Sequence, residues 1–266
     1  MLKLLWPVLL SGVSFTAVAQ TGRGGEGAPG GPPRGWQVGV GAVVSDSPYA
    51  GEGTRVVPIP LIGYEGERFY FRGITAGWTL LERGGFALTA QARLRLDGFS
   101  VDDLGRAALA RNGVDYRLLE DRDRGIDAGL GLQWRGAAGE LEIGLLTDVS
   151  GASDGQEVSV EYGYPVRLGA ATLTPRVGVS WLSDDMADYY YGTLDEEAAR
   201  GVVDYRPGSV TMPHIAISYR RPFGKKWTML ANVKYVRLPD EITVSPFIEP
   251  GVDGATSVFV GFSRWF

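Results

Sequence analysis

The chain has 266 residues, including 39 glycines, no cysteine and one histidine, and its formal net charge is −5. Without cysteine it can form no disulfide, thiolate zinc site or thiol nucleophile, and one histidine cannot build a multi-histidine metal centre. Neutralising phosphates requires clustered lysine and arginine, so an acidic chain without a long basic run is not expected to bind nucleic acid.

The first twenty residues have the composition of a secretory signal peptide. One basic residue precedes an apolar run that ends at Val18, and small residues suit cleavage after Ala19. The run is shorter than the roughly 20 residues of a membrane-spanning helix, which disfavours an uncleaved anchor. Glycine and proline then predict a flexible tether. The expected organisation is a signal peptide at 1–19, a tether at 20–35 and one domain at 36–266.

From residue 36 onward, apolar and polar side chains alternate with period two, as in strands that face lipid on one side and a polar interior on the other. Eleven segments are expected, at 36–46, 55–64, 67–82, 86–98, 125–135, 139–150, 156–167, 171–183, 208–220, 227–238 and 255–266. Bacterial single-chain barrels have an even number of strands. Twelve strands result if 67–82 is hinged at Gly73, and ten result if one N-terminal segment lies outside the wall. Twelve is the preferred number.

The connections between these segments alternate in length. Short turns fall at 83–85, 136–139, 168–170 and 222–226, and long polar segments fall at 99–124, 184–207 and 239–254. This is typical of an all-β fold, a closed antiparallel transmembrane β-barrel with short periplasmic turns and long external loops. A soluble two-sheet sandwich is the alternative. Tryptophans near segment ends suit the interfacial girdles of a barrel: Trp36, Trp134, Trp181, Trp227 and Trp265.

Two local features bear on individual strands. Pro58 and Pro60 fall inside an expected strand, where proline cannot donate to a neighbour, so a bulge or a sheet edge is expected there. At the C-terminus, 257–266 alternates and ends on Phe266, like the C-terminal strand read by the bacterial barrel-assembly machinery, although Arg264 interrupts its apolar face.

Two stretches resemble the MipA/OmpV family of outer-membrane proteins. The first, 38–77, has a glycine-rich strand, the motif SPYAG and the motif PIP; the second, 188–208, combines YYYG, EEAAR and YRPG. The resemblance extends over essentially the whole mature chain and implies an outer-membrane barrel without a catalytic motif. The best-known family member is described as a scaffold that brings a lytic murein transglycosylase together with a peptidoglycan synthase, and others as porin-like or immunogenic surface proteins. The resemblance therefore implies a non-enzymatic scaffold with those partners; a narrow channel for small polar solutes is the alternative.

The tyrosine-rich loop supplies the candidate contact residues. The stretch 196–200 predicts a short helix, and Tyr189, Tyr190 and Tyr191 are expected to pack it over the barrel mouth, with Arg206 bonding the turn. The alternative is contact with a partner, because exposed tyrosines offer rigid amphipathic area with a hydroxyl group.

Eight residues are the candidates for the barrel lumen: Arg93, Arg95, Arg135, Glu140, Glu142, Glu161, Arg176 and His214. Bases and acids balance over the inward positions. A selective pore usually lines its constriction with one sign of charge, whereas balanced charges can pair across strands and fill the interior. A barrel of ten or twelve strands is also narrower than a porin of about 16 strands. Bulk diffusion is therefore the weaker interpretation.

Motifs typical of enzymes and metal sites occur in this sequence only without the context or ligands that they require. The stretch 151–155 matches G-x-S-x-G, but a nucleophile elbow needs a strand followed by a helix, so a hydrolase using Ser153 and His214 is the least favoured hypothesis. An apparent calcium loop from Asp121 has Leu132 where a bidentate glutamate is required. No catalytic residue, cofactor site or metal site is expected. Acids of the loop beginning at Asp184 could still bridge lipopolysaccharide loosely, and outer-membrane lipid is an expected contact.

Overall fold

The computed structural model describes residues 34–266. The expected signal peptide, and all of the tether except its last two residues, lie outside the described residues. The sheet strands are β1 (Gly35–Asp46), β2 (Thr54–Glu65), β3 (Phe69–Arg72), β4 (Thr75–Arg83), β5 (Phe86–Arg95), β6 (Gly125–Gly136), β7 (Gly139–Asp148), β8 (Gln156–Gly163), β9 (Val166–Leu168), β10 (Ala171–Leu182), β11 (Val210–Phe223), β12 (Trp227–Arg237) and β13 (Gly254–Trp265).

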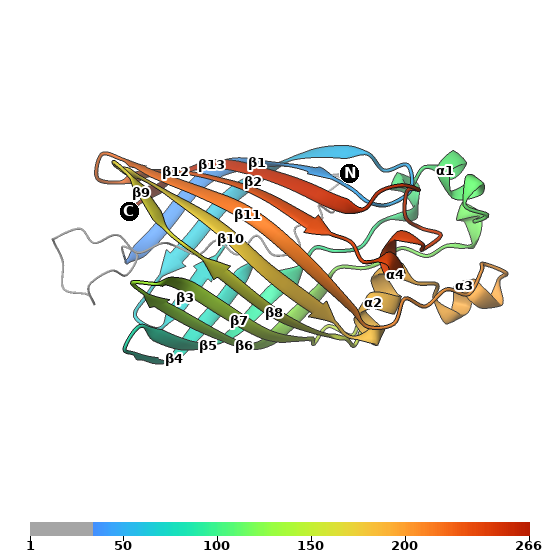
Figure 1. Cartoon of the computed structure of the whole chain (residues 1–266), viewed down its shortest axis with the longest axis horizontal. Helices are drawn as coiled ribbons and strands as arrows, with labels where there is room; N and C mark the ends of the chain where they lie inside the picture. The colour runs from blue at the N-terminus through green and yellow to red at the C-terminus, as the bar shows by residue number, and fades with distance from the viewer. Residues whose placement is uncertain (1–33) are drawn as a thin grey trace.

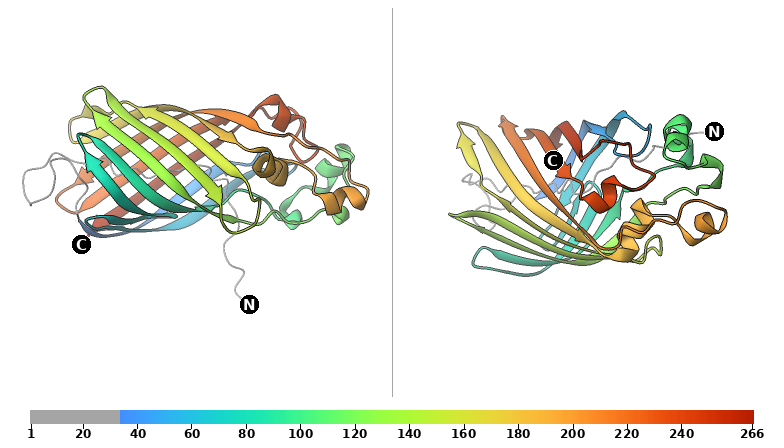
Figure 2. Two further views of the ribbon diagram at one scale, coloured as in Figure 1. Left: turned by 90° about the horizontal axis from the view of Figure 1, so that it is seen from below. Right: turned by 45° about the vertical axis from the view of Figure 1, so that its right-hand side comes forward.

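These strands form a closed antiparallel barrel (Figures 1 and 2). Neighbours in sequence pair around the wall, and β1 closes it against β13, with Gln37 opposite Trp265 and Ser45 opposite Ser257. Both β8 and β9 pair with β10, so they are two pieces of one wall strand interrupted at Tyr164 and Pro165. The barrel therefore has twelve strands in its wall, as the sequence predicted.

Residues 67–82 form two strands with a turn at Gly73, as the preferred count of twelve strands required. Gly73 has φ +61°, a left-handed conformation that favours glycine, and it lies in the turn between β3 and β4. The two strands then pair with each other, with Phe69 opposite Trp78 and Arg72 opposite Thr75. A single strand over 67–82 would have left the count odd.

The two ends of the barrel differ, as the connection lengths predicted. Both described termini lie at one end together with the short turns at 83–85, 136–139, 168–170 and 222–226. In an outer-membrane barrel this is the periplasmic end. Exposed aromatic side chains ring that end: Trp36, Phe69, Trp78, Phe86, Phe223, Trp227 and Phe266. Trp265 does not belong to this girdle. Its side chain points inward and is 8% exposed, because its register places it on the opposite face from Phe266, so that expectation was wrong.

The long connections carry all the described helices and gather at the other end (Figure 1). They are η1 (Val101–Asp103), α1 (Arg106–Arg111), η2 (Tyr116–Leu118), α2 (Asp184–Tyr191), α3 (Asp195–Ala199) and α4 (Asp240–Thr243). At α2, the Ser183 side chain accepts a hydrogen bond from the Met186 backbone, and Asp184 and Asp185 occupy the first turn, where the helix dipole favours acids. Of the helices within 34–266, none is long and apolar enough to cross a membrane.

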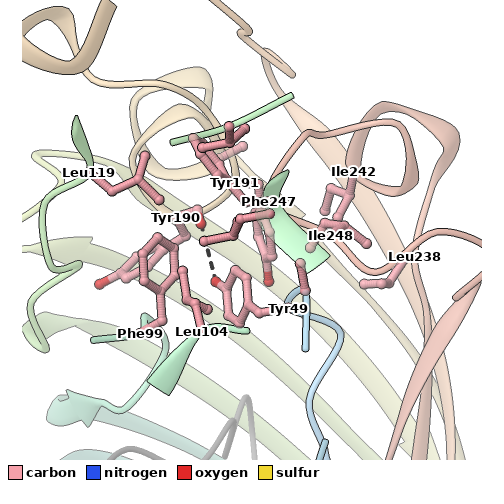
Figure 3. Packing of buried hydrophobic residues seen from close by; sticks show 14 of the residues in the cluster. Tyr49, Phe99, Leu104, Leu119, Tyr190, Tyr191, Leu238, Ile242, Phe247 and Ile248 are labelled. Carbon is pink, nitrogen blue, oxygen red and sulfur yellow. Dashed lines mark hydrogen bonds between the residues drawn. The ribbon is translucent and has the colours of Figure 1, made fainter. Parts of the chain in front are cut away.

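The main hydrophobic core lies in these external loops rather than inside the barrel. Tyr49, Phe99, Tyr190, Phe247 and Ile248 come from four different connections, yet each is at most 1% exposed (Figure 3). The Tyr49 hydroxyl donates to the Tyr190 carbonyl oxygen over 3.1 Å, and the rings of Tyr49 and Phe99 meet edge to face at 4.9 Å. We call this folded assembly of the loops 47–53, 96–124, 183–208 and 238–253 the external cap.

One strand of the wall has a partner along only part of its length. Strand β2 pairs with β1 from Thr54 to Glu65, but β3 pairs with it only at positions 63–65. The remainder of that edge, which includes Pro58 and Pro60, has no strand partner among the described residues. The edge expected at the two prolines is confirmed.

Candidate functional site: lumen and external cap

The lumen beneath the cap holds a cluster of ion pairs from three strands. Arg93 Nη2 lies 3.1 Å from Asp127 Oδ2 and 2.7 Å from Glu157 Oε2. Arg95 contacts the same two carboxylates and also Asp97, at 2.7 Å. Asp127 is fully buried, and Arg95 is 4% exposed. Two arginines and three acids are therefore paired with one another in the upper lumen, with one formal negative charge in excess.

A second cluster lies lower in the lumen, on the neighbouring strands β7, β8, β10 and β11. Arg176 reaches Glu140 at 3.1 Å, Glu161 at 2.7 Å and Glu142 at 3.8 Å. His214 Nε2 lies 3.0 Å from Glu161 Oε2. The sequence predicted that these residues face the lumen, because each lies on the polar face of a strand in which apolar and polar side chains alternate. The eighth candidate, Arg135, joins neither cluster and bonds Gln133 at 3.3 Å.

The external cap is fastened by a buried ion pair that sequence reasoning missed. Arg122 and Glu197 have fully buried side chains and meet at 2.7 Å and 2.8 Å through both guanidinium Nη atoms. Arg122 also donates to the carbonyl oxygens of Tyr189, Glu120 and Gly192. No local pattern links two residues 75 positions apart. The only sequence signal was the acidic start of the predicted short helix, which α3 confirms.

The surroundings of Glu197 favour the ionised form of its carboxylate. Burial alone would raise the pKa of Glu197, but hydrogen bonds and attraction from Arg122, with backbone N–H groups of Glu120 and Leu194, hold it below the ordinary value for a glutamic acid. The guanidinium group also lies over the Phe99 ring, with its carbon 5.2 Å from the ring centroid. The loops from β5–β6 and β10–β11 are therefore locked together by a satisfied ionic group.

The four candidate contact residues divide into two kinds. Tyr190 and Tyr191 are 1% and 4% exposed, and burial raises the pKa of both hydroxyls. They pack inside the core of the external cap and offer no open surface. Tyr189 is half-buried, and its hydroxyl accepts from the Asp123 backbone N–H at 2.8 Å. Arg206 is exposed and pairs with Asp195 and Asp204, so it bonds the turn around α3.

The residues of the hydrolase hypothesis are not assembled. Ser153 bonds Asp148, whose carboxylate also accepts from the backbone N–H groups of Ser150 and Asp154 in a tight turn between β7 and β8. His214 bonds Glu161 instead. Within residues 34–266, no group of three or more histidine, aspartate or glutamate side chains is arranged to hold a metal ion.

This chain is similar to known proteins in sequence and in fold. The family model described as "MltA-interacting protein MipA" matches residues 38–266. The MltA-interacting protein of Escherichia coli K12 is 31% identical over 228 residues, covering 85% of this chain and 89% of that protein. The putative outer membrane protein YiaT of the same organism is 31% identical over 216 residues, covering 80% and 84%. OmpV of Vibrio cholerae is 27% identical over 143 residues, covering 54% of each.

Among solved structures, the NanC porin covers 86% of this chain and all of its own at 8% identity, with a TM-score of 0.48. That likeness concerns the fold alone. The matches to the MltA-interacting protein and YiaT extend over most of both chains. YiaT and OmpV are named as outer membrane proteins. Together with the twelve-stranded wall, they show that the chain is an outer-membrane β-barrel belonging to the MltA-interacting protein (MipA) family.

Proposed function

We propose that the chain is a non-enzymatic scaffold that holds a lytic murein transglycosylase, and with it a peptidoglycan synthase, at the inner face of the outer membrane. The observation that carries the proposal is the folded external cap at the outer end of the barrel (Figure 1). The external cap has a hydrophobic core of its own and a buried ion pair between Arg122 and Glu197. A barrel closed by a folded cap serves as an anchor rather than as an open pore.

The lumen supports the same proposal. Its two ionic clusters contain both acids and bases, held in ion pairs at distances of about 3 Å, whereas a selective pore usually presents one sign of charge to the permeating ion. A barrel of twelve strands is also narrower than a porin of about 16 strands. Conduction would require these pairs to separate.

The periplasmic end offers the surface on which a partner would dock. Its exposed charges are mainly basic: Arg34, Arg68, Arg83, Arg167, Arg221, Lys225, Lys226 and Arg264, against Glu67 and Glu82. We call these residues the basic rim. Since the chain as a whole is acidic, the rim separates charge along the barrel axis, and it would attract an acidic surface on a periplasmic partner.

Cross-linked envelopes test the proposal. Affinity purification of the tagged protein is expected to recover a lytic transglycosylase and a peptidoglycan synthase. The triple variant Arg68→Glu, Arg167→Glu, Lys225→Glu should recover several-fold less of both, because it reverses the charge of the rim. Recovery of neither enzyme with the parent protein would refute the scaffold.

A matched variant controls for net charge. Arg111→Glu, Arg117→Glu, Arg200→Glu changes the charge by the same amount on exposed positions of the external cap. It should recover both enzymes at the parent level. Equal losses from the two triple variants would contradict docking at the basic rim.

A further inference from the structure

Three adjacent strands of the wall, β11, β12 and β13, carry no acidic residue (Figure 1). The segments 209–239 and 254–266, which contain these strands, have neither aspartate nor glutamate. At their periplasmic end they present four exposed cations: Arg221, Lys225, Lys226 and Arg264. The positive charge of the basic rim is therefore least balanced by acids on this side of the barrel.

Two of these cations, Arg221 and Arg264, lie on the lipid-facing side of the wall. Arg221 continues the outward series of Ile215 and Ile217 along β11, and Arg264 continues that of Phe262 along β13. Arg264 is the residue that interrupts the apolar face of the C-terminal strand. A charge on this side is costly in the middle of the bilayer, and the cost falls almost to zero near the interface. We therefore expect both guanidinium groups at the level of the lipid headgroups.

The contacts of the two arginines agree with that level. The Arg221 Cζ atom lies 5.0 Å from the ring centroid of Phe223, which is two residues nearer the periplasmic turn. The Arg264 Cζ atom lies 5.0 Å from the centroid of Phe266 and 5.8 Å from that of Trp227. All three rings belong to the exposed aromatic girdle, and such girdles sit at the membrane interface. Cation–π contacts thus hold both guanidinium groups beside the headgroups of the inner leaflet.

The two guanidinium groups are placed to share one anion. Within residues 34–266, neither Arg221 nor Arg264 forms an ion pair with an acidic group. In register, Arg264 is opposite Trp227 and Arg221 is opposite Met229, two residues further along β12. Two strand spacings and two residues of rise separate the arginine Cα atoms by about 12 Å. Two long side chains that start at this separation can approach the same headgroup.

We propose that Arg221 and Arg264 bind the headgroup phosphate of an anionic phospholipid, of the phosphatidylglycerol class, in the inner leaflet of the outer membrane. The acyl chains lie along the apolar outer face of β11, β12 and β13, where Ile217, Val233 and Phe262 are exposed. Both arginines belong to the basic rim, but they face the membrane and are unchanged in the triple variant that tests partner recovery. The lipid site therefore does not depend on the scaffold proposal.

Native mass spectrometry of the refolded protein measures the lipid preference. The protein is placed in nanodiscs that contain equal amounts of phosphatidylglycerol and phosphatidylcholine with the same acyl chains, and the lipids that stay on the released barrel are identified by mass. Since each basic residue near an anionic surface favours binding about fivefold, the two arginines together should favour phosphatidylglycerol about 25-fold. Equal retention of the two lipids by the parent protein would overturn the proposal.

A pair of matched variants locates the lipid. The double variant Arg221→Gln, Arg264→Gln removes both cations and should lower the preference about 25-fold. The control Arg68→Gln, Arg83→Gln removes the same charge from exposed positions at the same end of the barrel, beside the β3–β4 hairpin, and should leave the preference unchanged. Equal losses from the two double variants would contradict the assigned site, because only the total charge of the rim would then matter.

Two further arms separate charge from structure and lipid from free anion. The variant Arg221→Lys, Arg264→Lys keeps both charges and should retain most of the preference for phosphatidylglycerol. A loss as large as that of the glutamine pair would contradict charge pairing with the headgroup. Excess inorganic phosphate should not displace the bound lipid from the parent protein, because the acyl chains also contact the wall. Displacement would contradict the proposal and would indicate a site for the free anion instead.

Discussion

The substitution Arg122→Met tests whether the external cap is held by its buried ion pair. It removes five hydrogen bonds donated by the guanidinium group and leaves the Glu197 carboxylate buried without its cation. Removing one partner of a buried pair typically costs about 3–5 kcal/mol. At about 1.4 kcal/mol per factor of ten, the equilibrium for local opening of the cap should rise at least about 100-fold.

Hydrogen exchange followed by mass spectrometry measures that opening. Peptides from α1 and α2 should exchange about two orders of magnitude faster in Arg122→Met, while peptides from β6 and β7 keep their parental rates because the wall does not depend on the pair. Arg200→Met is the matched control. Arg200 pairs with Glu120 at 2.9 Å, but both side chains are about 40% exposed, and such a pair contributes only about 0–1 kcal/mol.

The double variant Arg122→Met, Glu197→Met separates the loss of the pair from the loss of packing. Replacing both partners with apolar residues leaves no uncompensated charge, so most of the protection should return. Equal exchange rates in the cap for Arg122→Met and Arg200→Met would refute the reasoning, because the pair would then carry no more of the cap's stability than an exposed one.

Three further outcomes are expected. Because the pKa of Glu197 is lowered in the folded cap, its stabilisation is present above about pH 4.3 and is lost as the pH falls through the lowered pKa; exchange of α2 should accelerate on acidification, and much less so in Glu197→Gln. Arg176→Met leaves Glu161 and its neighbouring acids without their cation, and should lower the free energy of unfolding in urea by about 3 kcal/mol in lipid vesicles, whereas a loss below 1 kcal/mol would contradict the lower lumen cluster. Gly73→Val places a β-branched residue at φ +61° and should cost at least about 1–2 kcal/mol in the same assay, while an unchanged midpoint would show that the β3–β4 turn is not constrained.

The wall of the barrel could be predicted because its signal is local and repeated. Alternation with period two marks most strands independently, and parity then reduces a set of eleven segments to a choice between ten and twelve strands, of which twelve was preferred. Even the hinge at Gly73 and the edge at Pro58 and Pro60 followed from the backbone chemistry of those residues. The exception is Trp265, where position near a strand end was mistaken for orientation toward lipid.

The external cap could not be predicted to the same extent. Helix α2 is short and lies in a segment assigned to a loop, since one turn of polar residues and three tyrosines give no clear helical period. Its core combines residues from four connections, and packing between distant segments leaves no periodic trace in any of them. Ion pairs in the lumen are intermediate: alternation indicated which residues face inward, and only the register shows that Arg93 meets Glu157 and that Arg176 meets Glu161.

The most direct test of the closed anchor is the conductance of the refolded protein in planar lipid bilayers. A barrel whose mouth is covered by the external cap and whose lumen is filled by paired charges should insert without steady unitary currents across the physiological range of salt and voltage. Reproducible unitary currents that persist at both polarities would contradict the account, because ions could then pass the two lumen clusters while the cap is in place.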